Sequence, residues 1–144
     1  MTKKPRAVFD TNVFVSSSLS KNVNSPTREL LQRWKNDEFT LLICDQIVKE
    51  LLEILNKRGV SLENVTEQVT TLARSAEWVV VPDEKIESLL SDPDDNVVVA
   101  CAVEGGANYL VTYDPHFDSL KGNYKGIMIV KAVPFLEVLR KSHE

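Results

Sequence analysis

Long hydrophobic runs, metal-type cysteine spacing and an excess of positive charge are all missing from this 144-residue sequence. The most apolar stretch, residues 97–103, is too short to cross a membrane, and no long apolar segment follows the basic N-terminal residues. Cys44 and Cys101 stand inside apolar runs, where small buried thiols are common. We therefore expect a cytoplasmic protein with reduced cysteines and no membrane-spanning segment.

Internal repeats, low-complexity segments and domain linkers are also missing. A chain of 144 residues with 43% hydrophobic content is large enough to bury a core without disulfides. We expect one domain covering residues 1–144. The net charge of −4 permits a nucleic-acid partner but does not argue for one.

Short, continuously apolar segments alternate with amphipathic ones along the chain. This alternation predicts a parallel β-sheet with helices on both faces. The expected strands are residues 7–9, 39–44, 78–81, 109–111 and 127–130.

Helix boundaries are marked by capping residues and glycines. We expect helices that begin after the caps Ser25, Asp45, Ser61 and Asp83, a buried helix over residues 96–104, and a last amphipathic helix after the fifth strand. The serine-rich residues 16–25 are expected to form a loop, and residues 122–126 a turn-rich connection.

Four carboxylates separated in the sequence occupy positions that this fold brings to one edge of the sheet. Asp10 and Asp114 follow strands, Glu50 lies at the border of the apolar face of a helix, and Asp95 begins the buried helix. In open parallel sheets, sites form beyond the carboxyl ends of the strands. Two carboxylates about 5 Å apart repel by roughly 3 kcal/mol at an effective dielectric of about 20, so such a cluster needs a compensating cation. Oxygen ligands alone point to Mg²⁺ or Mn²⁺.

Each acid also has a simpler interpretation by itself. An aspartate after a strand is common in turns, Asp92, Asp94 and Asp95 are suited to capping a helix, and Glu50 is compatible with a solvated helix edge. The coincidence of four acids at one edge favours the metal site.

The ordered set of motifs resembles the PIN-domain ribonucleases, in particular the PIN-family toxin components of type II toxin–antitoxin systems. The resemblance spans nearly the whole chain. The motifs that carry it are VFDTNV at residues 8–13, VKEL at 48–51, DPDDN at 92–96 followed by Ala100 and Ala102, and LVTYDPHF at 110–117.

This resemblance implies a three-layer α/β/α fold with a central five-stranded parallel sheet of order 3-2-1-4-5. It also implies Mg²⁺- or Mn²⁺-dependent cleavage of RNA, a cognate antitoxin protein as partner, and a homodimer. The acidic ligands and catalytic residues would be Asp10, Glu50, Asp95 and Asp114. Asp95 is preferred to the adjacent Asp94 because Ala100 and Ala102 then fall at the spacing of the family.

Five further residues are expected to surround these ligands. Thr11, Asn12 and Thr112 would orient carboxylates or metal-bound water. Asp94 and Asp92 would lie just outside the ligands, and for Asp92 a role in the turn is an equal alternative. Lys21, Arg28, Arg33, Lys35 and Lys49 are candidates for contacts with the RNA backbone.

Two other functions are compatible with the pattern. Phosphotransfer or phosphatase chemistry through an aspartyl phosphate also uses an aspartate after a parallel strand, and Lys131 after the fifth strand superficially fits it. Against this, the residue two positions after Asp10 is Asn12 and not a second acid. The third possibility is a non-catalytic nucleic-acid-binding domain of the same fold.

Overall fold

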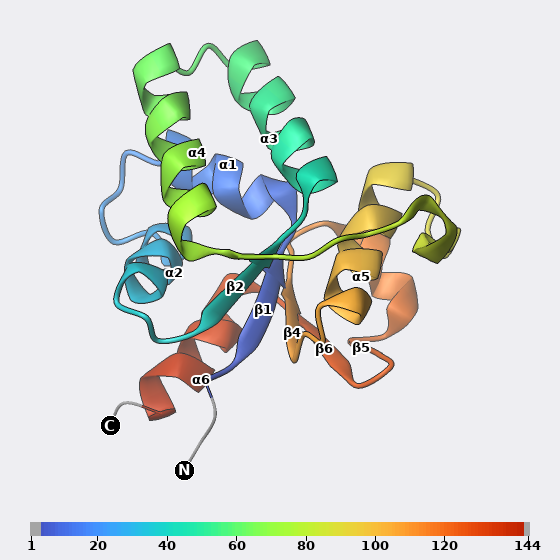
Figure 1. Cartoon of the computed structure of the whole chain (residues 1–144). Coiled ribbons are helices and arrows are strands. Elements are labelled where there is room, and N and C mark those ends of the chain that lie inside the picture. The colour runs from blue at the N-terminus through green and yellow to red at the C-terminus, as the bar shows by residue number, and fades with distance from the viewer. Residues whose placement is uncertain (1–3, 143–144) are drawn as a thin grey trace.

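The computed structural model describes residues 4–142 and contains one twisted sheet between two layers of helices (Figure 1). The sheet has the order β3-β2-β1-β4-β6-β5. All neighbouring strands are parallel except β5 and β6. The strands are β1 (Arg6–Phe9), β2 (Thr40–Ile43), β3 (Glu77–Trp78), β4 (Tyr109–Val111), β5 (Asn123–Tyr124) and β6 (Ile127–Val130).

The helices cover both faces of this sheet. α5 packs on β1, β2 and β4, whereas α6 packs on β4 and on α2, behind the sheet in Figure 1. α1 contacts both α2 and α3, and α3 forms a hairpin with α4. The helices are α1 (Thr11–Leu19), α2 (Pro26–Lys35), α3 (Asp45–Lys57), α4 (Leu62–Ser75), α5 (Pro93–Glu104) and α6 (Ala132–Ser142), with short 3-10 turns η1 (Asp83–Lys85) and η2 (Pro115–Leu120).

The three-layer α/β/α class and the order of the five parallel strands are confirmed. The structure also has one strand that was not expected, β5. It lies inside the connection expected over residues 122–126 and pairs with β6 in a tight hairpin. Lys125 and Gly126 at its turn have φ values of 50° and 84°. Two positive φ values are typical of the type I′ turn that matches the twist of paired strands. The Lys-Gly pair is a weaker signal for this turn than Asn-Gly, and the strand is only two residues long.

The expected loop over residues 16–25 is partly wrong, because α1 starts directly after Asp10 and continues to Leu19. Val13, Phe14 and Val15 are buried in this helix. Their packing outweighs the weak helix propensity of the three serines that follow. The consequence for the site is that Asp10 occupies the N-cap position of a helix.

Other boundaries also differ from the expectation. Asp45 is the first residue of α3 rather than its cap, and Cys44 occupies the N-cap position. Asp83 does not cap a helix, because only a single 3-10 turn forms there. The third strand ends at Trp78 instead of residue 81, and α5 begins at Pro93, three residues earlier than expected. The caps Ser25 and Ser61 are confirmed by hydrogen bonds to the backbone N–H groups of Arg28 and Asn64.

One hydrophobic core joins the sheet to its helices. Phe9 lies at its centre and contacts the rings of Phe14, Phe39 and Phe135 at 5.5–6.5 Å between centroids. Cys44 and Cys101 are both free and fully buried, as expected. Among residues 4–142, no helix has the length and apolar character needed to span a membrane.

The strand order reverses beside β1, and this reversal positions the site. The chain runs outward from β1 to β2 and β3, then returns to place β4 on the other side of β1. Phe9 pairs with Val111, so Asp10 and Thr112 leave the sheet side by side. Such a switch point is where open parallel sheets form their crevices.

Candidate metal centre

Asp10 is fixed at the end of β1 by backbone and side-chain contacts. Its N–H donates to the carbonyl of Val111 at 2.9 Å. Its Oδ2 accepts a hydrogen bond from the Thr112 hydroxyl at 2.8 Å. Asp10 is 4% exposed and Thr112 5%. A buried carboxylate is therefore held at the switch point by its neighbour on β4.

Asp95 enters from the first turn of α5. Asp92 is the N-cap, and its Oδ1 accepts from the N–H of Asp94 at 2.9 Å, while Pro93 occupies the first helical position. Proline is preorganised for that position, and an acid in the first turn is stabilised by the helix dipole. Asp95 is 4% exposed, so this turn delivers a buried carboxylate.

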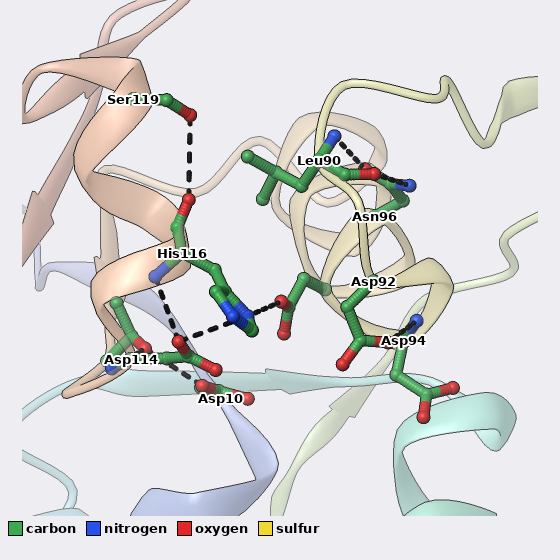
Figure 2. A network of polar contacts seen from close by, with 10 residues as sticks. Asp10, Leu90, Asp92, Asp94, Asn96, Asp114, His116 and Ser119 are labelled. Carbon is green, nitrogen blue, oxygen red and sulfur yellow. Dashed lines mark hydrogen bonds and ion pairs between the residues drawn. The ribbon is translucent and has the colours of Figure 1, made fainter.

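Asp114 and His116 come from the turn after β4. The Asp114 N–H donates to Thr112 Oγ1 at 3.0 Å, and Asp114 Oδ1 accepts from the N–H of His116 at 2.9 Å. The imidazole turns back over the site, with Nδ1 at 3.1 Å from Asp95 Oδ2 and 3.3 Å from Asp114 Oδ1. Figure 2 shows His116 between the turn that carries Asp114 and the first turn of α5.

The structure brings Asp10, Asp95 and Asp114 together, with one carboxylate oxygen of each within 4.8 Å of the others. Ligands on opposite sides of a Mg²⁺ ion are about 4 Å apart, so the spacing of these three oxygens is close to what one small divalent cation requires. Within residues 4–142, no lysine or arginine forms an ion pair with these carboxylates. The chemistry of the donors therefore suits a hard cation.

Glu50 does not join this group of three. Its Oε2 accepts from the Thr11 hydroxyl at 3.2 Å, on the side of the site formed by α1 and α3. Its charge interacts most with Asp94 and then with Asp10. Of the four predicted ligands, Asp10, Asp95 and Asp114 have carboxylate oxygens close to one another, and Glu50 lies beside this group.

Three acids of the site, Asp10, Glu50 and Asp95, have raised pKa values. Burial raises the pKa of Asp95 to about 6, with further rises from Asp10 and Asp114 and an opposing hydrogen bond from His116. Burial and then the charge of Asp94 raise the pKa of Glu50 to about 7. Burial also raises the pKa of Asp10, against the effect of the Thr112 hydrogen bond. The hydrogen bond to Asp95 and the charge of Asp114 raise the pKa of His116. Clustered carboxylates with raised pKa values mark a candidate functional site.

The surrounding residues expected from the sequence lie in different places. Thr112 contacts Asp10 and Thr11 contacts Glu50. Asn12 is exposed, and its side chain has no hydrogen-bond partner among the described residues. Asp94 is exposed and points away from Asp114 at the rim of the site, while Asp92 is half-buried on the N-cap (Figure 2).

Two residues were missed by the sequence reasoning. His116 was given no role from the sequence, although its position two residues after Asp114 in the LVTYDPHF motif was a usable signal. Asn96 is buried, and its Oδ1 accepts from the N–H groups of Leu89 and Leu90 while its Nδ2 donates to the Leu90 carbonyl. These hydrogen bonds hold the segment that contains Leu89 and Leu90 against α5. A sequence pattern alone does not reveal such contacts.

The model of the PIN domain family matches residues 6–116, a range that includes every carboxylate described above and His116. This chain belongs to the PIN domain family. The match covers more than half of the chain and ends within the turn after β4. No curated protein sequence matches this PIN domain.

Solved structures of low sequence identity share the fold of this PIN domain. VapC20 of Mycobacterium tuberculosis, described as a sarcin–ricin loop cleaving toxin, has a TM-score of 0.59 at 12% identity over 85% of this chain and 98% of its own. VapBC2 of Rickettsia felis, bound to a promoter DNA fragment, has a TM-score of 0.60 at 14% identity, covering 86% and 96% of the two chains. FitAcB of Neisseria gonorrhoeae has a TM-score of 0.54 at 15% identity, covering 88% and 98%.

Proposed function

We propose that this PIN domain is a divalent-metal-dependent endoribonuclease that acts as the toxin of a toxin–antitoxin pair. The observation that carries the proposal is the convergence of Asp10, Asp95 and Asp114 at the switch point of a PIN fold. The similarity to a VapC toxin described as cleaving the sarcin–ricin loop supports RNA as the substrate class.

Asp10, Asp95 and Asp114 would hold the ion, which we propose to be Mg²⁺ or Mn²⁺. When bound, the ion would neutralise phosphate charge and activate water for hydrolysis. Thr112 keeps Asp10 oriented by its hydrogen bond, and the same hydroxyl accepts the N–H of Asp114. One side chain thus orients two of the three proposed ligands.

Glu50 is proposed to act as a general base and not as a metal ligand beside Asp10, Asp95 and Asp114. Its pKa of about 7 leaves Oε1 and Oε2 partly ionised at neutral pH, which suits a general base. The Thr11 hydroxyl donates to Oε2 and sets its orientation. Glu50 would accept the proton of the attacking water, so that no side chain of the protein needs to act as nucleophile.

The RNA backbone must approach an acidic site, and exposed lysines are the proposed contacts. Lys49 precedes Glu50 on α3 and is exposed, as are Lys21 and Lys35. Arg33 is a weaker candidate, because its guanidinium already forms ion pairs with Glu29 and Glu38.

The partner and context are proposed from the similar structures. The VapBC2 and FitAcB complexes support a cognate antitoxin as the partner of this chain. A homodimer, a cytoplasmic location and the extent of the domain over residues 1–144 stay predictions from the sequence.

The proposal is tested by incubating a mixed RNA pool with the protein in Mg²⁺, in Mn²⁺ and in EDTA. The wild type is expected to cleave only with metal, and Asp10→Asn and Asp95→Asn are expected to lose about 100-fold or more of the rate. Asp83→Asn, which removes an exposed acid on η1, is the matched control and should cleave normally. A wild type that cleaves no RNA with either metal, or an active Asp10→Asn variant, would overturn the proposal.

A further inference from the structure

One edge of the sheet is formed by β3 and the three valines that follow it, the edge segment of residues 77–81. Figure 1 shows this segment as part of the extended yellow-green stretch that leaves α4. Trp78 is 42% exposed there and Val80 84%. We propose that the edge segment binds the same segment of a second copy of this chain, in antiparallel orientation about a two-fold axis at Val79. The sheets of the two copies join through this contact.

Alternate residues of the edge segment use their backbone groups inside the molecule. The N–H of Val79 donates to the carbonyl of Ile43 at 2.7 Å. The carbonyl of Val81 accepts from a glutamine side chain of α3 at 2.9 Å. Successive residues of a strand direct their N–H and C=O groups to opposite sides. The backbone groups of Trp78 and Val80 therefore point away from the sheet, where an edge strand can accept another strand.

Antiparallel pairing about Val79 satisfies these outward groups. It places Trp78 of each copy directly opposite Val80 of the other. In an antiparallel ladder, every second pair of opposite residues exchanges both of its N–H···O bonds. The two Trp78–Val80 pairs are such pairs, and the Val79 residues face each other between them. Pro82 has no N–H, so it ends the ladder directly after the edge segment.

The side chains of the edge segment suit the same arrangement. Val79 and Leu42 each direct a methyl group at Gly105, which follows α5. Because side chains alternate along a strand, Trp78 and Val80 lie on the opposite face. In the dimer, each Trp78 ring lies across from Val80 of the other copy, and an aromatic residue opposite a β-branched one is a favourable pair. The contact thus covers the two exposed apolar side chains of each edge segment.

The charges at the two ends of the edge segment favour an antiparallel second copy. Arg74 lies in the last turn of α4, just before the segment, whereas Asp83 and Glu84 lie on η1, just after it. All three side chains are exposed, and none forms an ion pair within residues 4–142. Antiparallel pairing brings the basic end of each copy to the acidic end of the other, so opposite charges meet at both ends of the contact. Parallel pairing would bring like charges together.

Sedimentation equilibrium of the full chain in EDTA tests this contact. From about 1 μM to about 1 mM the mass should rise from monomer towards dimer, because a short edge contact is weak. Trp34 is buried, so a blue shift of the tryptophan emission over the same range reports the covering of Trp78. Val80→Asp should weaken dimerisation about 10-fold or more and abolish the shift. Val23→Asp, at an exposed valine before α2, is the matched control and should dimerise as the wild type does.

Charge reversal tests the antiparallel orientation. Arg74→Glu and Glu84→Arg should each weaken the dimer, and the double variant should recover most of the wild-type affinity. A double variant that dimerises no more tightly than either single variant would overturn this orientation. A wild type that stays monomeric up to about 1 mM, or a Val80→Asp protein that dimerises as tightly as the wild type, would overturn the contact itself. Neither metal nor RNA takes part in these measurements, so their outcome is independent of the RNA-cleavage test.

Discussion

Thr112 donates its hydroxyl hydrogen to Asp10 Oδ2 at 2.8 Å and accepts the backbone N–H of Asp114 at 3.0 Å. The two aspartates lie 104 positions apart in the numbering, and the pairing of β1 with β4 lets one hydroxyl group bond to the side chain of the first and the backbone of the second. Groups that orient metal ligands contribute about 10–100-fold to metal affinity. Thr112 is therefore expected to matter although it is not itself a proposed ligand.

Thr112→Val should weaken Mn²⁺ binding about 10–100-fold. Valine has nearly the same shape, but it removes the hydrogen bond that opposes the raised pKa of Asp10. Isothermal titration calorimetry at pH 7.5 measures the effect, and Thr112→Ser, which keeps a hydroxyl, should stay within a few-fold of wild type. Equal affinities of the valine and wild-type proteins would show that Thr112 does not orient the site.

Asp95→Asn should stabilise the metal-free protein at pH 8. Burial and neighbouring charges raise the pKa of Asp95 to about 6, so the ionised carboxylate destabilises the folded state at this pH. Thermal unfolding in EDTA should show a higher Tm for the variant than for the wild type. Each kcal/mol gained in the free energy of unfolding raises the Tm by about 2–4 °C.

The same variant should lose most of the stabilisation by metal. A ligand at 100 times its Kd stabilises the wild type by about 2.7 kcal/mol, and Asp95→Asn should show much less of this gain. Asp83→Asn, with its exposed acid on η1, should behave as wild type in both conditions. A lower Tm of Asp95→Asn in EDTA would contradict the electrostatic cost assigned to the site.

Glu50→Gln should change how stability depends on pH. The folded-state pKa of about 7 lies above the ordinary value of 4.5, so the folded state binds the extra proton between these two values. The contribution of Glu50 to stability is thus fully present below about pH 4.5 and is lost as the pH rises through about 7. Denaturant unfolding in EDTA from pH 4.5 to 8 should show a smaller decline for Glu50→Gln. Glu53→Gln, an exposed acid on the same helix, is the control and should retain the wild-type slope. Parallel curves for wild type and Glu50→Gln would refute the raised pKa.

Asn96→Ala should destabilise the protein by roughly 2–4 kcal/mol. The change leaves the buried N–H and carbonyl of Leu90 without their partner, and each unsatisfied group costs about 1–3 kcal/mol. The N–H of Leu89 loses its bond to Asn96 but still donates to the carbonyl of Glu87. Hydrogen exchange should accelerate at Leu89 and Leu90 first. Asn56→Ala, at an exposed helix position, is the control and should change stability by less than about 0.5 kcal/mol. Unchanged exchange at Leu89 and Leu90 would mean that Asn96 does not hold this segment.

Much of the fold could be read from the sequence because the parallel strands are continuously apolar and well separated. The hairpin of β5 and β6 was missed because it has a two-residue strand and a Lys-Gly turn. α1 was missed because its serines conceal the helical pattern, and its burial depends on tertiary contacts. Local patterns fail where packing between distant segments decides the structure.

The site was predictable where strand ends fix the residues, as with Asp10 and Asp114. Asp95 rather than Asp94 reaches the group because Pro93 starts the helix early and turns Asp95 inward. The separate position of Glu50 depends on how α3 packs, which no spacing in the sequence encodes. The position of His116 two residues after Asp114 places it near the site, but its contact with Asp95 depends on how η2 packs.

The most direct test of the central claim is a crystal grown with Mn²⁺ and measured for anomalous scattering near the manganese edge. An anomalous peak is expected within about 2.3 Å of a carboxylate oxygen from each of Asp10, Asp95 and Asp114. In an Asp10→Asn crystal this peak should weaken or disappear. A fully occupied Mn²⁺ site elsewhere, with no peak among these three carboxylates at saturating metal, would contradict the account.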